Sequence, residues 1–443
     1  MASTSEQDVA SELEHKKQIR AWTLYDWGNS AFATTIMAAV LPVYYTTVAA
    51  SGLAPNIATA YWGFTSSISA LIAAIISPIL GAVADFRGTK KKFLTIFMAI
   101  GVTATALLYF IQSGDWLLAS IFFVFGNVGF AGSLVYYDAL LPHVAKPHEM
   151  DQVSSRGYAM GYIGGGILLA LNLVMIMFLP DLLGVDAGLM TRLTFITVAV
   201  WWFVFTLPLL LRVKEPPRRI QLGEEGFSPL KASFSRLSQT FKEIRKYRDL
   251  SLGLLAFWVY ANGIGTIIVM ATAYGSELGF SQITLIGTLL MVQFLAAPFA
   301  FFFGWLSKKI GTKKSIYISL SIYTIIAIAG YFLYQEWQFW VLGAAVATVQ
   351  GGSQALSRSL VAKMMPKSKS AEFFGFFSVF EKFASILGPA LFGVVSTIMG
   401  ESRLSIVSLI IFFGLGIFIL SKVNVEKGIQ VALEEEQSLV PSE

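Results

Sequence analysis

Gly81-Ala-Val-Ala-Asp85-Phe-Arg-Gly88-Thr-Lys-Lys returns later in the chain as Gly304-Trp-Leu-Ser-Lys-Lys-Ile-Gly311-Thr-Lys-Lys. Both stretches follow a long apolar segment, and their shared Gly, Gly, Thr, Lys and Lys lie at a constant spacing of 223 residues. A further echo comes after two other apolar segments, where Pro142 and Pro366 are expected to end helices. The repetition indicates two related halves produced by gene duplication.

The composition around these stretches is that of a membrane protein. Of the residues, 55% are hydrophobic and 13% charged, with a mean hydropathy of +0.67, whereas soluble domains carry about a quarter charged residues. A helix needs about 20 apolar residues to cross the bilayer. Twelve segments meet this requirement, near residues 23–46, 57–83, 92–112, 116–140, 156–180, 190–212, 250–274, 281–306, 314–334, 337–361, 372–398 and 403–422. The sequence therefore predicts an all-α membrane protein with twelve transmembrane helices in two pseudo-symmetric six-helix bundles.

One long polar interruption divides the chain. We expect an N-terminal bundle with a short tail over residues 1–212, a cytoplasmic linker over 213–249, and a C-terminal bundle with its tail over 250–443. Within the linker, Ser228-Pro229 is typical of a helix start, and apolar residues then recur at helical spacing among Lys and Arg. This pattern predicts an amphipathic helix on the anionic membrane surface. A solvated linker with chance periodicity is the alternative.

The distribution of Lys and Arg predicts the orientation. With the N-terminus inside, the outer loops contain only Arg192 and Arg403, whereas the inner segments contain most of the basic residues. Positive charge gathers on the cytoplasmic side, so both termini are expected there. The polar first twenty residues lack the apolar core of a signal peptide.

The repeated turn has an expected use. Gly81 would let two helices approach closely, and Gly88 would support a tight reversal. Asp85 at the membrane edge needs a hydrogen-bond donor, and the best candidate is the positive end of the eleventh helix, near Ala371–Phe373. An ordinary basic turn is the alternative, but two copies in register favour a conformational role.

These turns resemble the signature loop between helices two and three of the major facilitator superfamily, over roughly residues 20–422. More narrowly, the stretch from Trp22 to Phe32, Gln354-Ala-Leu-Ser-Arg358-Ser and the region from Phe373 to Pro389 are similar to the vacuolar effluxer family linked to autophagy and its bacterial members. The resemblance implies the major facilitator fold and a carrier. Fungal members return amino acids from the vacuole to the cytosol, and the compact loops here favour a bacterial inner-membrane protein.

Charged residues inside the eleventh expected helix are the first candidates for function, because such residues are costly in a membrane. Ser378, Glu381, Lys382 and Ser385 share one helical face, and Glu381 is expected about 14 Å deep. Glu381 is a candidate proton carrier, and Lys382 could hold a substrate carboxylate. A structural ion pair is the alternative.

Polar stripes in other helices extend the candidate binding site. Asp26, Asn29 and Ser30 share a face of the first helix, and Asp26 is a candidate for a cation or gating contact. An aromatic-rich anchor at the membrane interface is an equally weighted alternative for this segment. Gln350, Ser353, Gln354 and Ser357 share a face of the tenth helix, which the superfamily resemblance places along the cavity. Asn262 and Thr266 are expected only to bridge helices.

Asp138 and Arg358 come from opposite halves, near the inner ends of the fourth and tenth helices. They could form a gate pair that breaks when the halves rock, or either could pair with Arg156 or Glu372. The sequence contains no nucleotide-binding pattern, metal-ligand cluster or catalytic triad, so neither an enzyme nor a cofactor is expected, and no nucleic acid partner.

We therefore expect a monomeric secondary active transporter working by alternating access. Its expected cargo is an amino acid or related metabolite, its direction efflux, and its coupling ion the proton. The alternatives are a drug or organic-anion exporter, a uniporter, or a membrane receptor derived from a transporter.

Overall fold

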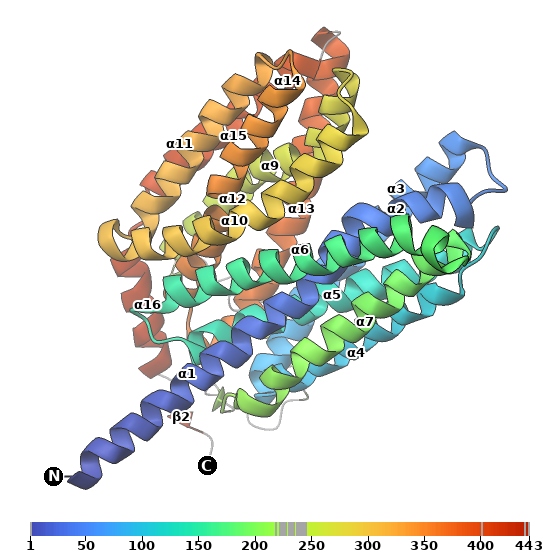
Figure 1. The fold of residues 1–443 in the computed structure, drawn as a ribbon. Helices are drawn as coiled ribbons and strands as arrows, with labels where there is room; N and C mark the ends of the chain where they lie inside the picture. The colour runs from blue at the N-terminus through green and yellow to red at the C-terminus, as the bar shows by residue number, and fades with distance from the viewer. Residues whose placement is uncertain are drawn as a thin grey trace.

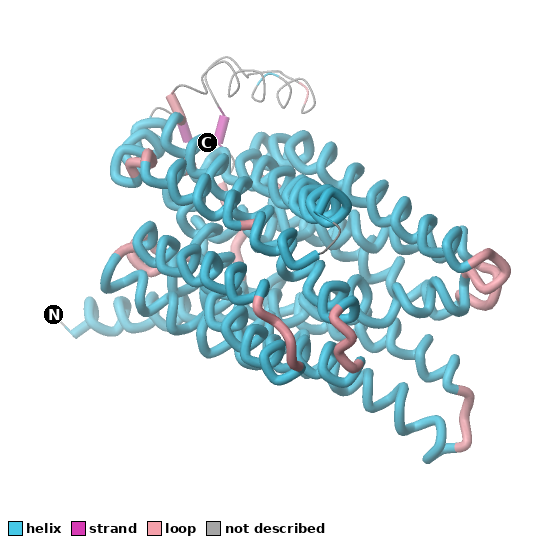
Figure 2. Tube along the Cα trace, turned by 90° about the horizontal axis from the view of Figure 1, so that it is seen from above, coloured by secondary structure: helices cyan, strands magenta, loops and turns pink. Residues whose placement is uncertain are grey.

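The structure is a computed structural model that describes residues 2–217, 219–220, 228, 235, 246–399, 402–437 and 440–441. Almost all of these residues are helical, with short loops between long helices (Figure 2). The N-terminal half comprises α1 (Ala2–Ala31), η1 (Phe32–Ala39), α2 (Val40–Tyr44), η2 (Tyr45–Ala49), α3 (Pro55–Arg87), α4 (Lys90–Leu107), η3 (Leu108–Phe110), α5 (Trp116–Val144), α6 (Met150–Leu183) and α7 (Ala187–Arg212). The C-terminal half comprises α9 (Arg248–Glu277), α10 (Gln282–Ile310), α11 (Thr312–Tyr331), α12 (Glu336–Met364), η4 (Lys367–Lys369), α13 (Ser370–Met399), α14 (Ser402–Ser408), α15 (Ile410–Ser421) and α16 (Val425–Gln437).

The all-α membrane fold predicted from the sequence is confirmed. In the described part of the chain, ten segments are long and apolar enough to cross a membrane. The helices α12 and α13, of 29 and 30 residues, complete two sets of six. Neither helix is among the ten apolar segments. The helix α12 carries the polar residues Gln350 and Gln354, and part of α13 is not described at the side-chain level.

The two halves form a V (Figure 1). Both chain termini lie at the end where the halves meet, which we call the terminal end, and the halves diverge towards the opposite end, which we call the open end. The most extensive helix contacts across the interface are those of α3 with α13 and of α6 with α10. These pairs are equivalent under the duplication, because α10 is the repeat of α3.

Glycine lets the first pair approach. A Cβ atom on Gly81 would lie 2.3 Å from the carbonyl oxygen of Ala371 on α13. Gly88 ends α3 with φ of 62°, and its repeat Gly311 has φ of 91°, a backbone region that disfavours side chains. The sequence predicted both features at the first turn.

The first helix differs from the expected short tail and span. It begins at Ala2, and its polar part projects beyond the bundle (Figure 1). The polar residues continue the helix because Glu12 and Lys16 pair one turn apart, at 2.6 Å, and no Gly or Pro interrupts the sequence before Gly28. His15 also contacts Glu149, next to α6.

One further expectation needs revision. Pro142 lies inside α5, which ends two residues later at Val144, whereas Pro366 follows the end of α12 as predicted. The C-terminal tail contains the helix α16, followed by β2 (Val440–Pro441), which pairs with β1 (Arg219–Ile220) of the linker. Except for Ser228 and Ser235, the amphipathic linker helix expected after Ser228 lies outside the described residues.

Candidate functional site

Arg358 on α12 lies at the centre of a polar cluster between the two halves. Its side chain is 2% exposed. Its Nη1 atom lies 2.9 Å from Asp138 Oδ1 on α5 and 3.4 Å from Asp26 Oδ2 on α1. Its Nε donates to Ser154 Oγ (2.9 Å) and its Nη2 to the Ser154 carbonyl oxygen (2.8 Å), both on α6. The structure thus brings together Asp138 and Arg358, and adds Asp26.

Aromatic side chains and a glycine complete the surroundings of these charges. The Tyr137 hydroxyl donates to Asp26 Oδ2 at 2.8 Å. A Cβ atom on Gly157 of α6 would lie 2.7 Å from the same oxygen and 2.9 Å from Arg358 Nη2. The cluster fits only because α6 carries hydrogen in place of a side chain at this point.

Such a buried network resists the loss of any one member. Removing one partner of a buried ion pair costs about 3–5 kcal/mol, because the remaining charge stays desolvated. Here Arg358 belongs to one half, and Asp26 and Asp138 belong to the other. The network therefore stabilises the contact between the halves, and separating them at this point requires water or another charged group to replace each partner.

Glu381 on α13 is exposed, and it lies near charged and aromatic residues of the N-terminal half. One turn earlier, Phe377 stacks on Phe257 of α9 with ring centroids 4.1 Å apart, and Gly375 packs against Pro78 of α3. The Glu381 charge interacts with Asp138 and Tyr158 of the N-terminal half. Its carboxylate therefore faces the space between the halves.

The other candidates on α13 have different surroundings. Lys382, the next residue along the helix, is partly buried. Ser378 is buried, and the side chain of Ser385 lies outside the described set. The polar face expected for these four residues stays a prediction.

The stripe of α12 faces α6 of the opposite half. The Tyr162 hydroxyl donates to Gln354 Oε1 at 2.8 Å, while Gln350 is partly exposed. Asn29 on α1 is buried. In α9, the Asn262 side chain accepts a hydrogen bond from the Gly388 amide of α13 (3.1 Å), which matches the helix-bridging role expected for it.

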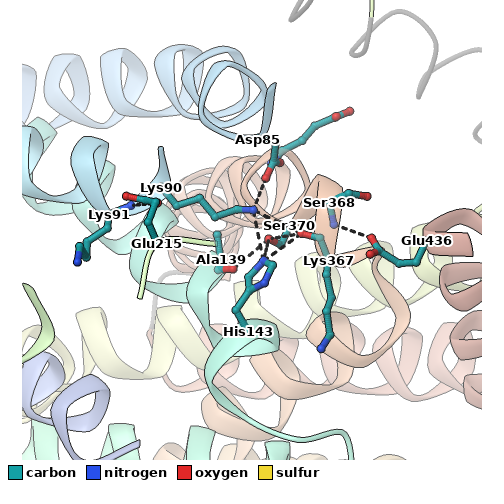
Figure 3. Close-up of polar contacts among 11 residues, drawn as sticks. Asp85, Lys90, Lys91, Ala139, His143, Glu215, Lys367, Ser368, Ser370 and Glu436 are labelled. Carbon is teal, nitrogen blue, oxygen red and sulfur yellow. Dashed lines mark hydrogen bonds and ion pairs between the residues drawn. The ribbon is translucent and has the colours of Figure 1, made fainter. Parts of the chain in front are cut away.

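Asp85 reaches the start of α13 at the terminal end. Its Oδ2 accepts a hydrogen bond from the Glu372 amide at 2.8 Å, and its Oδ1 lies 2.7 Å from Lys90 Nζ. Lys90 Nζ also lies 3.3 Å from His143 Nε2 and 3.4 Å from the Lys367 carbonyl oxygen (Figure 3). A carboxylate at a helix N-terminus is favourable. We call these five residues the first latch.

The repeated turn makes an equivalent contact, which we call the second latch. Asp151 near the start of α6 lies 2.7 Å from both Thr312 Oγ1 of α11 and Lys363 Nζ of α12. The Ser359 hydroxyl donates to the other oxygen of this carboxylate. Both latches therefore join the two halves at the terminal end.

Several of these residues were not identified from the sequence. Ser154, Tyr158, Asp151 and Lys363 were missed, and Arg156, considered as a partner, is exposed. The spacing of Asp151, Ser154 and Tyr158 on one helical face was the available signal. Among the described residues, no three His, Asp or Glu side chains converge as metal ligands.

Comparisons with known proteins agree with this architecture. A family model described as "Vacuole effluxer Atg22 like" matches residues 14–433. The uncharacterized MFS-type transporter YxiO of Bacillus subtilis is 42% identical, over 95% of this chain and 97% of its own. Autophagy-related protein 22-1 of Penicillium rubens is 24% identical, over 90% of this chain and 82% of its own.

A solved structure shows the same fold. The proton:xylose symporter XylE, bound to 6-bromo-6-deoxy-D-glucose, superposes with a TM-score of 0.72 at 16% identity, covering 96% of this chain and 99% of that one. At this identity the likeness establishes the fold alone. With the family match, it shows that this chain belongs to the vacuole effluxer Atg22-like family and is a transporter of the major facilitator superfamily.

Proposed function

We propose that this chain is a secondary active transporter that exports a small solute, an amino acid or related metabolite, by proton-coupled alternating access. The observation that carries the proposal is the cluster in which Arg358 of one half pairs with Asp26 and Asp138 of the other. Charged groups inside a membrane are costly and mark the path of an ion or solute. The cluster lies where two pseudo-symmetric bundles meet, which is where carriers of this kind place their sites.

The alternating step follows from the position of the latches. In the present conformer the terminal end is closed by Arg358 and by both latches, while the halves diverge at the open end (Figure 1). Opening the terminal end requires these cross-half contacts to break together. Such a set of contacts supports two discrete arrangements of the halves.

Proton coupling is supported by the charge balance. Asp26 and Asp138 supply two carboxylates beside the single guanidinium of Arg358. A proton, or a cationic group of the solute, would compensate the excess negative charge. Glu381 is the best carrier because it is exposed to the space between the halves.

The cargo and direction rest on other grounds. Glu381 and Lys382 are neighbouring groups of opposite charge, which suit the ammonium and carboxylate of an amino acid. Efflux follows the description of the family. We place the chain in a bacterial inner membrane as a monomer, with the terminal end cytoplasmic, because the basic residues gather there and because YxiO is bacterial.

The test is transport by the purified chain in proteoliposomes. Labelled amino acids should undergo saturable counterflow, and an imposed proton gradient should drive their accumulation. Glu381→Gln should retain counterflow. Its gradient-driven accumulation should fall about tenfold or more, because the group that carries the proton has been removed.

The matched control is Glu277→Gln, which neutralises an exposed carboxylate at the end of α9 in the same half. This variant should behave like the parent chain. Binding without counterflow would identify a receptor and contradict the proposal. Full proton-driven accumulation by Glu381→Gln would contradict the coupling role alone.

A further inference from the structure

Every hydrogen bond and ion pair found for the Arg358 guanidinium in the described residues comes from the N-terminal half. Asp26 and Asp138 balance its charge, and Ser154 accepts from Nε through Oγ and from Nη2 through its carbonyl oxygen. The side chain itself is carried by α12 of the other half. A cation of the C-terminal half is therefore held in a pocket built by the N-terminal half.

Aromatic rings line the same pocket. The guanidinium carbon lies 4.4 Å from the ring centroid of Tyr158, 5.0 Å from that of Trp22 and 5.5 Å from that of Tyr137. Rings at these distances attract cations, and aromatic cages combined with carboxylates recognise ammonium and guanidinium ligands. We call the six residues Trp22, Asp26, Tyr137, Asp138, Ser154 and Tyr158 the cation box.

The cation box is held together without Arg358. The Trp22 indole donates to the Tyr137 carbonyl oxygen at 2.9 Å, and the two rings stack with centroids 4.2 Å apart. The Tyr137 hydroxyl in turn donates to Asp26. These contacts all lie within one half, so they persist when the halves separate. The box would then carry two carboxylates and no cation.

Resting on the proposed carrier function, we infer that the cation box binds the guanidinium or ammonium group of a cationic solute when the terminal end is open. In the closed conformer Arg358 occupies the same position as an internal competitor. One cation fits the box at a time, because the guanidinium already takes both carboxylates, both acceptors of Ser154 and the three rings. Closure of the terminal end thus displaces the solute.

Glu381 gives the displaced cation a next partner. Its carboxylate is exposed between the halves and interacts electrostatically with Asp138 of the box. A cation that leaves the box can therefore pass to Glu381 without crossing an uncompensated apolar region. The order of contacts is the box, then Glu381, then the open end. This order gives Arg358 a direct part in solute release.

The probe is agmatine, which carries a guanidinium and an ammonium group but no carboxylate. Its control is N-carbamoylputrescine, in which a neutral urea replaces the guanidinium. Ligands that bind the folded chain raise its melting temperature, so both are titrated against the full-length protein in detergent. Agmatine should raise the melting temperature of the parent chain. The urea compound should bind with an apparent affinity about tenfold lower, or less, because the box selects for charge.

The variants separate the box from other sites. Arg358→Ala removes the competitor and should raise the apparent agmatine affinity at least about tenfold, because the box is then always vacant. The double variant Asp26→Asn with Asp138→Asn should lose the agmatine response. If that variant fails to fold, Tyr158→Leu should lower the affinity about tenfold, and Tyr158→Phe should restore it by returning the ring face.

The outcomes are decisive. No agmatine response in the parent chain or in Arg358→Ala, or an equal response in Tyr158→Leu and Tyr158→Phe, would overturn the inference. Counterflow of a neutral labelled amino acid is measured as well, because it distinguishes failure of the cation box from failure of the proposed carrier function. If counterflow occurs while agmatine does not bind, the carrier function stands and the cation box is wrong. If no solute is exchanged, the carrier function fails, whatever the agmatine result.

Discussion

The first and second latches are copies of one turn, yet they place their carboxylate on opposite sides of the interface. In the first latch, Asp85 lies on the repeated turn itself and reaches across to the Glu372 amide of α13. In the second, the equivalent position is Lys308, and the carboxylate is Asp151 on the facing helix α6, reaching back to Thr312 of the turn. The duplicated turn kept its backbone conformation and its contact with the opposite half, but the carboxylate of that contact lies on the turn in the first latch and on the facing helix in the second.

The two latches also differ in how deeply their charges lie. The side chains of Lys90 and Asp85 are 4% and 0% exposed, and those of Lys363 and Asp151 are 16% and 8% exposed. Loss of a partner is most costly where water cannot replace it. The comparison therefore implies that the first latch contributes more to closing the terminal end.

The largest effect is expected from Asp85→Asn, compared with Asp151→Asn. Removing the Asp85 charge leaves Lys90 buried, which should cost the closed conformer about 3–5 kcal/mol. Asp151→Asn should cost about 1–2 kcal/mol, because its amide oxygen still accepts one of the two hydroxyl hydrogen bonds that Asp151 receives from Thr312 and Ser359, and because Lys363 is closer to water. The measurement is the distance between spin labels at Arg87 and Lys308, two exposed positions at the terminal end in opposite halves.

The native chain contains no cysteine, so an introduced pair is labelled alone. Asp85→Asn should shift the distance distribution mainly to the longer, open value, and Asp151→Asn should leave a majority in the closed value. Equal shifts in the two variants would show that the latches are equivalent and would remove the basis of the comparison.

A second pair of variants tests close packing in place of charge. A Cβ atom on Gly81 would lie 2.3 Å from a backbone oxygen of α13, whereas one on Gly304 would lie 2.8 Å from the Ser155 Cβ of α6. The backbone oxygen is the less adaptable neighbour. Gly81→Ala should therefore destabilise the closed conformer by about 1–3 kcal/mol, and Gly304→Ala by less.

The readout for these alanine variants is the rate of counterflow, which requires closure in every cycle. Gly81→Ala should slow it several-fold more than Gly304→Ala, and the same spin labels should report a larger open fraction. A greater loss in Gly304→Ala would place the tighter contact in the second half.

Local features of this fold follow from the sequence, because they depend on nearby residues. The twelve long helices follow from apolar runs, and the left-handed conformation of Gly88 follows from the turn that it must form. Asp85 at the start of α13 was also predictable, because a carboxylate at the membrane edge needs donors and a helix N-terminus supplies them.

The composition of the cation box was harder to predict. The sequence offered Asp138 and Arg358, 220 residues apart, as a possible pair, but the residues that surround them depend on how α5, α6 and α12 pack. Sequence spacing put Tyr158 and Ser154 on one face of α6 but could not show which helix that face contacts. The extension of α1 was missed for a different reason, since a polar helix outside the membrane and a polar tail have similar compositions.

The smallest expected effect concerns α16, which reinforces the first latch. Its Glu435 lies 2.8 Å from Lys369 and also contacts Lys246, and its Glu436 accepts a hydrogen bond from the Ser368 amide at 2.6 Å. These contacts hold the segment whose Lys367 carbonyl meets Lys90. Burial alone would raise the pKa of Glu435, but hydrogen bonds from the two lysines outweigh it and hold the pKa below its ordinary value of 4.5.

A lowered pKa in the folded chain fixes the sign of the pH dependence. The stabilisation by Glu435 is complete above about pH 4.5 and is lost as the pH falls through the lower folded value. A spin label at the exposed Leu433 should stay immobile at neutral pH and gain mobility under acid. Glu435→Gln should show the mobile spectrum already at neutral pH. The control Glu434→Gln, at an exposed position on the same helix, should follow the parent chain, and a mobile label in both variants would mean that α16 is not held by Glu435.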